Sequence, residues 1–319
     1  MAVAGCSALP GAGPEQASPA PATSTSAPPV APVTTQEAAS ILEDYVKRNN
    51  AANKVMSDEL LAGYEGGSSL VIDKAGYASQ RKLGGRSYQP FDYIKPTYTV
   101  PAVKEGRWFL TTAYWKGKSE TAKEPTYLLF ARDGESWRQM YAPDVFEGQA
   151  TDELPEITTD AAEVAQSDAA GLMMSPAAFA RSYAAHLVGK GTTTSKSRFA
   201  ADRLTTGAAS NRINMNPYAK LTESARPATA YPSYALRTAD GGALAFATIE
   251  RSRRYDVRQG PERNYVNLKD NGLLTGKYYT YMKLTELIQV VAHIPPKTAE
   301  LGQVKVIGSY SGIISGSGR

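Results

Sequence analysis

Residues 126–142 read TYLLFARDGESWRQMYA, and this stretch decides the fold class of the first half of the chain. Its two arms are rich in aromatic and aliphatic residues, which suit strands of a half-buried sheet, and Asp133-Gly134 between them is a tight-turn signal. Residues 97–103 and 107–116, TYTVPAV and RWFLTTAYWK, have the same character and precede it. The stretch therefore predicts the end of an antiparallel meander.

A helix is predicted ahead of this meander. Thr34-Thr35-Gln36-Glu37 is a capping box, in which the side chains of Thr34 and Glu37 each accept a hydrogen bond from the other residue's backbone amide. The apolar residues that follow are spaced as one face of a helix: Ala38, Ile41, Leu42, Tyr45 and Val46. The first half therefore reads as a helix followed by an antiparallel sheet.

The same order of elements returns in the second half. Ser175-Pro176 predicts a helix start with proline in the first turn. The apolar face behind it consists of Phe179, Tyr183, His186 and Leu187. Strands are predicted at residues 231–238, 243–257, 278–294 and 304–315. Asp240-Gly241-Gly242 supplies a hairpin turn between the first two strands, so the chain repeats one arrangement.

We expect two tandem α+β domains at residues 34–155 and 175–319, joined by an acidic linker at 156–174. Each half falls in the usual size range of a domain. A helix followed by a curved antiparallel sheet that wraps it resembles the cystatin-like and NTF2-like folds. The resemblance implies a cone between sheet and helix, which side chains either fill or leave open as a pocket.

The first 33 residues differ from the rest in composition. Residues 7–33 are almost wholly Ala, Pro, Ser, Thr and Gly, and Glu15 carries their only charge. Such a segment has too little apolar side-chain volume to offset its ordering entropy, so we expect a disordered tether. Before it stands Val3-Ala4-Gly5-Cys6, which resembles the lipobox of bacterial lipoproteins, and Cys6 is the only cysteine in the chain.

The lipobox resemblance implies that a diacylglyceryl group is attached to the sulfur of Cys6. Only Met1 to Gly5 precede this cysteine, fewer residues than a signal peptide needs, so we expect the signal peptide to start further upstream. Two acyl chains hold a protein stably at a membrane. The expected location is the outer face of the cytoplasmic membrane, with the membrane as a partner through the lipid on Cys6.

The whole chain, from the lipobox to the second meander, resembles uncharacterised lipoproteins of actinomycetes. The helix at residues 37–53, with Tyr45, Asn49 and Asn50, adds to this resemblance. The resemblance implies a lipid-anchored envelope protein and assigns no functional residue other than Cys6.

Few residues suit catalysis or metal binding. The chain has two histidines, His186 and His293, and one cysteine, so a zinc or haem site has little support and no cofactor is expected. Residues 308–312, GSYSG, have the glycines of a nucleophile elbow, but tyrosine stands where serine is required. Ser79-Gln80-Arg81-Lys82 matches a Ser-x-x-Lys pattern whose companion motifs are missing. No catalytic residue is predicted.

We therefore favour a non-catalytic envelope module that binds a protein, a glycan or an anionic polymer. The alternative is an enzyme whose site lies in the cone of an NTF2-like domain, where Asp, Glu or Tyr performs acid and base steps without histidine. A pocket that holds a buried carboxylate of raised pKa favours the enzyme, and a filled cone favours the binding module.

Positive charge is concentrated in the second half. Residues 176–319 contain 20 Lys and Arg against 9 Asp and Glu, a net charge of +11. The densest part includes Arg251, Arg253, Arg254 and Arg258, and strand alternation puts Arg251 and Arg253 on one face and Arg254 on the other. These arginines are candidates for binding an anionic envelope polymer or lipid headgroups. The alternative is a solvated, edge-protecting surface. Nucleic acid is not an expected partner of an exported protein.

Overall fold

The computed structural model of the chain describes residues 33–101, 107–117, 123–149, 153–158, 161–193, 197–260, 264–299 and 302–319. Cys6 lies outside the described residues, and so does the predicted tether except for its last residue. That residue, Val33, is buried in the core of the first half and is therefore part of the folded body. Among the described residues, no helix combines the length and the apolar character that crossing a bilayer requires.

The helices of the first half precede its strands, as predicted. They are α1 at Thr35–Val55, α2 at Asp58–Ala62 and α3 at Gly67–Lys82. The capping box is confirmed, since Glu37 N donates to Thr34 Oγ1 at 3.1 Å and Thr34 N donates to Glu37 Oε2 at 2.7 Å. The apolar face of α1 packs Leu42 and Tyr45 into a core with strand residues. The sequence pattern predicted neither α2 nor α3.

The second half has the helices α4 at Pro176–Leu187 and α6 at Arg203–Met215. The start of α4 is as predicted, because Ala178 N donates to the Ser175 hydroxyl at 3.3 Å and Pro176 lies in the first turn. Helix α6 was not predicted. Its N-cap is Asp202, whose Oδ1 accepts from the amides of Leu204 and Thr205 at 2.8 and 2.9 Å.

The strands of the first half are β1 at Tyr93–Thr99, β2 at Trp108–Trp115, β3 at Thr126–Asp133, β4 at Ser136–Tyr141 and β5 at Asp144–Val145. Those of the second half are β6 at Ala219–Pro227, β7 at Tyr234–Arg237, β8 at Ala243–Val257, β9 at Tyr281–Ile294 and β10 at Lys305–Gly318. The predicted turn joins β3 to β4, where Asp133 pairs with Ser136. Gly134 has a φ of 59°, a conformation that glycine adopts without steric cost.

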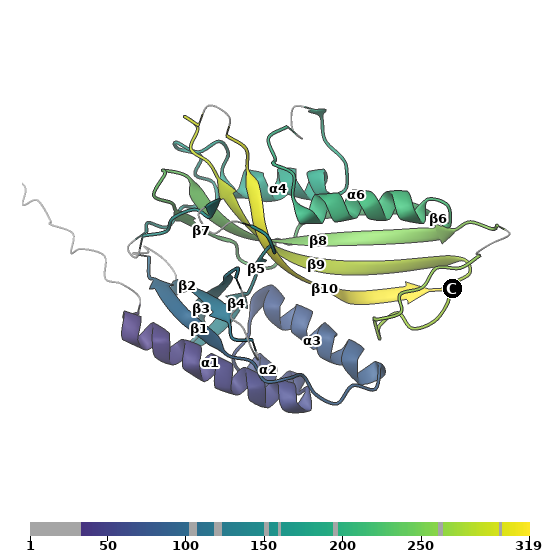
Figure 1. Ribbon diagram of the computed structural model, residues 1–319, viewed down its shortest axis with the longest axis horizontal. Coiled ribbons are helices and arrows are strands. Elements are labelled where there is room, and N and C mark those ends of the chain that lie inside the picture. Colours follow the sequence, from purple (N-terminus) through teal and green to yellow (C-terminus); the bar gives the residue numbers. More distant parts are fainter. Residues whose placement is uncertain are drawn as a thin grey trace, which may run out of the picture.

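All named strands belong to one ten-stranded antiparallel sheet, so the predicted α+β class is confirmed (Figure 1). The strand order is β1-β2-β3-β5-β10-β9-β8-β6, with β4 paired to β3 and β7 to β8. The two halves meet where the short strand β5 pairs with β10, at Val145 with Gly308 and Asp144 with Ser309. A side chain at Gly308 would collide with the Asp144 backbone, so this contact requires glycine.

A buried polar network also joins the two halves. Gln289 on β9 is fully buried and donates from Nε2 to the hydroxyls of Ser68 and Ser69 on α3, both at 2.9 Å. Ser68 also lies 2.8 Å from the Thr248 hydroxyl on β8. Buried polar groups need such partners, because an unpaired one costs about 1–3 kcal/mol. Helix α3 is thereby fixed against strands of the second half.

The described part of the predicted acidic linker lies along β7. Val164 N donates to Ala235 O at 2.9 Å, and Arg237 N donates to Ala162 O at 2.8 Å. From the same segment, the Glu163 carboxylate accepts from Trp108 Nε1 on β2 at 2.9 Å. The segment therefore contacts strands of both halves.

Candidate ligand-binding site

A cavity of about 560 Å³ opens between the first half of the chain and β10 of the second half. It is enclosed by α1, α3, the loop at residues 88–91, β1, the end of β2 and the middle of β10. Seven aromatic residues line it: Tyr45, Tyr77, Tyr88, Phe91, Tyr93, Trp115 and Tyr310. A cavity of this size with a mostly apolar, aromatic lining is typical of small-molecule sites. We call it the aromatic pocket.

The aromatic side chains form two groups. In the first, the ring centroids of Tyr93 and Trp115 lie 4.6 Å apart, and those of Phe91 and Trp115 lie 5.0 Å apart. In the second, Tyr77 of α3 lies 5.7 Å from Tyr88 of the following loop. Rings at these distances are tilted or edge to face, which is the favourable geometry for aromatic pairs. The rings therefore hold one another in place in the absence of a ligand.

Asparagines of α1 hold the loop that carries Tyr88 and Phe91. Asn50 Nδ2 donates to Phe91 O at 2.8 Å, and Phe91 N donates to Asn50 Oδ1 at 2.9 Å. Tyr77 OH donates to Asn53 Oδ1 at 2.7 Å, and Tyr88 N donates to the backbone oxygen of Asn53 at 3.1 Å. The helix that the sequence predicts at residues 37–53 thus positions one side of the pocket.

Two carboxyl groups meet beside the pocket. Asp73 of α3 lines the cavity, and the hydroxyl of Tyr310 on β10 donates to its Oδ1. Glu65, in the turn between α2 and α3, is fully buried and shares a hydrogen bond with Asp73. Asn49 Nδ2 donates to Glu65 Oε1 at 3.3 Å.

The two carboxyl groups differ in protonation. Burial raises the pKa of Glu65 well above its usual range, and the neighbouring charge of Asp73 and their hydrogen bond raise it further. Burial also raises the pKa of Asp73, while hydrogen bonds from Tyr310 and Glu65 oppose that rise. The pair therefore shares a proton, which Glu65 holds more readily because it is the more deeply buried and the more strongly shifted of the two. Two carboxyls in contact share one proton because two adjacent negative charges are costly.

No local sequence pattern predicts this site. Residues 308–312 have the glycines of a nucleophile elbow but not its serine. Tyr310, which stands in the position of that serine, lines the pocket and donates to Asp73. A signal was present in α3, where Ile72, Asp73, Gly76 and Tyr77 lie at the spacing of one helix face. Charged residues are rarely buried, so a carboxylate on a helix face that also carries an isoleucine and a tyrosine is a sign of a functional site.

The four arginines predicted to bind an anionic partner lie elsewhere, on β8 and just after it. Arg251 and Arg253 are on one face, as predicted, and both pair with acidic residues: Arg251 Nε lies 3.1 Å from Glu223 Oε1, and Arg253 Nη2 lies 3.0 Å from Glu286 Oε2. Only 7% of the Arg251 side chain is exposed. These two arginines are neutralised inside the protein.

Arg254 and Arg258 are exposed. Arg254 lies 2.8 Å from Asp256 and 4.3 Å above the ring of Tyr281. Arg258 Nε donates to Asn216 O at 2.9 Å. The structure thus separates the four predicted residues into a buried pair and an exposed pair.

The other residues singled out from the sequence have structural contacts. The Ser79 hydroxyl accepts from Gly272 N at 2.7 Å, which holds a loop against α3. His186 stacks on Phe199 with ring centroids 4.9 Å apart. His293 lies 3.1 Å from Asp240, and burial lowers its pKa although Asp240 opposes this. Within the described ranges no three His, Cys, Asp or Glu residues are grouped as metal ligands would be.

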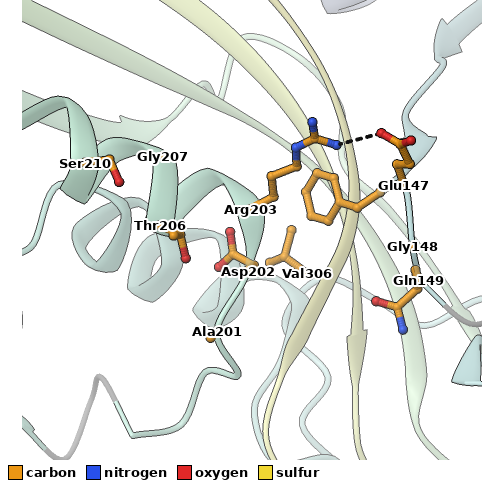
Figure 2. A pocket seen from close by; sticks show the side chains of 11 residues that line it. Glu147, Gly148, Gln149, Ala201, Asp202, Arg203, Thr206, Gly207, Ser210 and Val306 are labelled. Atoms are coloured by element: carbon orange, nitrogen blue, oxygen red, sulfur yellow. Dashed lines mark ion pairs between the residues drawn. The ribbon is translucent and has the colours of Figure 1, made fainter.

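A second hollow, of about 660 Å³, lies beside the start of α6 (Figure 2). Arg203 points toward Glu147 across it, 3.9 Å away, and both side chains are mostly exposed. Asp202 is already engaged by the first turn of α6 and by the Tyr183 hydroxyl at 2.9 Å. Most of the described residues that line this hollow are exposed, so the more enclosed aromatic pocket is the better candidate.

The fold and the aromatic pocket define the class as an α+β protein with a ligand-sized cavity. The chain belongs to the family described as a domain of unknown function (DUF8094), which matches residues 29–318. It is 29% identical over 301 residues to an uncharacterized lipoprotein of Streptomyces coelicolor, covering 89% of this chain and 86% of that protein.

The chain is also 26% identical over 250 residues to an uncharacterized lipoprotein of Streptomyces avermitilis, covering 75% of this chain and 72% of that protein. These matches confirm the resemblance to uncharacterised actinomycete lipoproteins. No solved structure matches the chain.

Proposed function

We propose that this chain is an exported lipoprotein that binds a small organic ligand in the aromatic pocket. The observation that carries the proposal is the pocket, where seven aromatic residues surround a cavity of about 560 Å³ with a carboxyl pair at its edge. Apolar surface gives affinity and a few fixed polar groups give orientation. Asn49 and Gln139 are buried polar residues that line the cavity.

The pocket can be blocked without disturbing the backbone. Gly76 lies within α3 and lines the cavity, and a Cβ added there meets only the Tyr88 hydroxyl, at 3.6 Å. We expect Gly76→Leu to abolish ligand binding while the protein stays folded, because leucine favours helix over glycine by roughly 0.5–1 kcal/mol. The measurement is a screen of small metabolites by thermal shift, followed by calorimetric titration of any ligand found.

The matched control is Gly207→Leu in α6, where an added Cβ meets nothing within 4 Å. This variant should keep binding. Binding that survives Gly76→Leu would place the ligand elsewhere.

The lipid anchor is proposed from Val3-Ala4-Gly5-Cys6 and from the names of the two relatives. The anchor would hold the protein at the outer face of the cytoplasmic membrane. Expressed behind a lipoprotein signal peptide in an actinomycete, the protein should fractionate with membranes and carry a diacylglyceryl mass. Unchanged membrane association of Cys6→Ser would contradict the anchor.

We also propose that residues 34–155 and 175–319 are two related domains of cystatin-like or NTF2-like type, with 156–174 as the linker. The support is the order of elements, a helix start followed by antiparallel strands in each half. The aromatic pocket is consistent with an open cone beside the helices of the first half, although β10 of the second half completes its lining. In the second half, α4 packs Phe179 and Tyr183 against the sheet.

An enzyme is the second candidate, and the carboxyl pair favours it. Carboxyl groups of raised pKa beside a cavity are typical of acid and base catalysts. Asp73, which lines the cavity, would take a proton from the ligand as the base and return it to the product as the acid, with Glu65 behind it as the second carboxyl of the pair. Turnover of a bound ligand, followed by mass spectrometry and lost in Asp73→Asn with binding retained, would establish this function over simple binding.

A further inference from the structure

The aromatic pocket carries negative charge without a basic partner. Among the described residues that line it there is no Lys, Arg or His. Among the described residues, no ion pair includes Glu65 or Asp73. Asp144, a second carboxylate at the cavity, accepts hydrogen bonds only from neutral groups, Trp115 Nε1 at 2.8 Å and the Thr126 hydroxyl.

Burial of this negative charge is unfavourable in free energy. A carboxylate removed from water loses several kcal/mol of solvation unless a cation or hydrogen bonds replace it. Asp73 has hydrogen bonds from Tyr310 and Glu65 but no counterion. Oε2 of Glu65 has no hydrogen-bond donor among the described residues and is free to carry the proton of the pair, so the negative charge lies mainly on Asp73. Among the described residues, no basic side chain therefore compensates the negative charge of Asp73.

The aromatic rings of the pocket also lack a cation. Elsewhere in the protein, Arg48 lies 5.5 Å from the ring of Tyr64, Arg132 lies 5.5 Å from Trp137, and Arg254 lies 4.3 Å from Tyr281. Among the described residues, no Lys or Arg lies over a ring that lines the pocket. The faces of these rings carry negative potential and attract a cation within about 6 Å.

We infer that the pocket binds an organic cation, a primary or quaternary ammonium compound. Its charge lies beside Asp73, and its carbon atoms pack on the aromatic rings. The inference rests on the proposed function of the pocket and names the class of ligand. An anionic ligand is excluded by charge, because nothing in the lining would compensate it. A neutral ligand would fill the volume but leave Asp73 without a counterion.

The test compares ligands of equal shape and different charge. Choline, its uncharged isostere dimethylbutanol and the anion dimethylbutyrate are titrated calorimetrically into the folded protein. We expect choline to bind at least about tenfold more tightly than dimethylbutanol, since a desolvated cation–π contact is worth about 2 kcal/mol and a tenfold ratio needs 1.4 kcal/mol. No binding of the anion is expected.

Equal affinity for choline and the alcohol would overturn the inference and leave the proposed pocket function standing. If choline, tetramethylammonium and benzylamine all fail to bind, the inference is wrong as well. If in addition no small molecule in the thermal-shift screen binds, the pocket function fails with it.

Two variants locate the charge effect. Asp73→Asn keeps the shape and removes the charge, so choline affinity should fall at least about tenfold, as one lost charge contact implies, while dimethylbutanol affinity is unchanged. Asp44→Asn is the control, because Asp44 is an exposed carboxylate on α1. Unchanged choline affinity in Asp73→Asn would overturn the assignment of Asp73.

The role of Asp73 can also be tested by pH in the unmodified protein, so this test does not depend on whether a variant folds. Choline prefers ionised Asp73, so its affinity should fall as pH falls through the pKa of Asp73, which lies above the usual 3.8. Besides Glu65, the ionisable groups near Asp73 are Asp144, Arg138, whose Nη1 donates to the Glu65 backbone oxygen at 3.3 Å, and six tyrosines: Tyr45, Tyr64, Tyr77, Tyr88, Tyr93 and Tyr310. Burial raises the pKa of each of these six tyrosines above 10, so they stay neutral in the acid range. A pH-independent affinity between pH 4 and pH 8, roughly the range of carboxyl titration, would contradict the inference.

Discussion

Glu65 is the residue whose burial has the clearest consequence for stability. Its pKa in the folded protein is raised, so the folded state holds a proton that the unfolded state releases above the usual pKa of 4.5. The free energy of unfolding is therefore largest below that pH and falls as pH rises toward the folded pKa. This is the reverse of the usual carboxylate, which stabilises a protein as pH rises.

We expect Glu65→Gln to stabilise the protein at pH 7 by about 1 kcal/mol or more, since each pH unit above the unfolded pKa costs 1.36 kcal/mol. Glutamine can still donate to Asp73 and accept from Asn49. Urea unfolding between pH 4.5 and pH 8 should show a shallower loss of stability in this variant. Glu135→Gln, at a fully exposed carboxylate, is the control. An unchanged pH slope would mean that Glu65 is not the proton holder.

At the scale of elements, β8 carries basic residues of two kinds. Arg251 and its partner Glu223 are buried, so Arg251→Ser should destabilise the protein. The cost should be less than the roughly 3–5 kcal/mol of a buried charge that loses its only partner, because Glu223 keeps its ion pair with Arg212 at 2.9 Å. Arg254 and Arg258 are exposed, and we propose that they contribute to binding an anionic envelope polymer or lipid headgroups.

The double variant Arg254→Ser, Arg258→Ser should keep the urea midpoint and weaken binding to vesicles of anionic lipid at low salt. Binding should also weaken between 0.01 M and 0.15 M salt, as the Debye length falls from about 30 Å to about 8 Å. Arg226→Ser on neighbouring β6, also exposed, controls for loss of a single charge. If the unmodified protein does not bind such vesicles at 0.01 M salt, Arg254 and Arg258 are only part of a solvated surface.

Local patterns explain which elements were predictable. The capping box, the turn at Asp133-Gly134 and the alternation on β8 depend on neighbours a few residues apart, and the structure has all three. Helices α3 and α6 were not predicted because their buried faces have few large apolar residues and, on α6, Ile213 is exposed instead. The pocket depends on Asp73 and Tyr310, which no local pattern brings together.

At the scale of the whole molecule, the two halves share a sheet and a buried network. Expressed separately, residues 34–155 and 175–319 should each unfold cooperatively, because each has its own core cluster. Mixing them should raise the unfolding temperature of both, since Gln289 then regains its partners on α3. Circular dichroism on the fragments and on the mixture measures this. Fragments that are unfolded alone and structured only together would contradict the two-domain division.

The hydrogen bond between Asp73 and Tyr310 spans 237 residues of sequence. A ribosome delivers α1, α3 and the first aromatic residues early, and β10 reaches them only after the second half has emerged. Until then the carboxyl pair faces water and the cavity has no far side. The proposed binding site is therefore completed only when β10 folds. A nascent or truncated chain without β10 should not bind a ligand there.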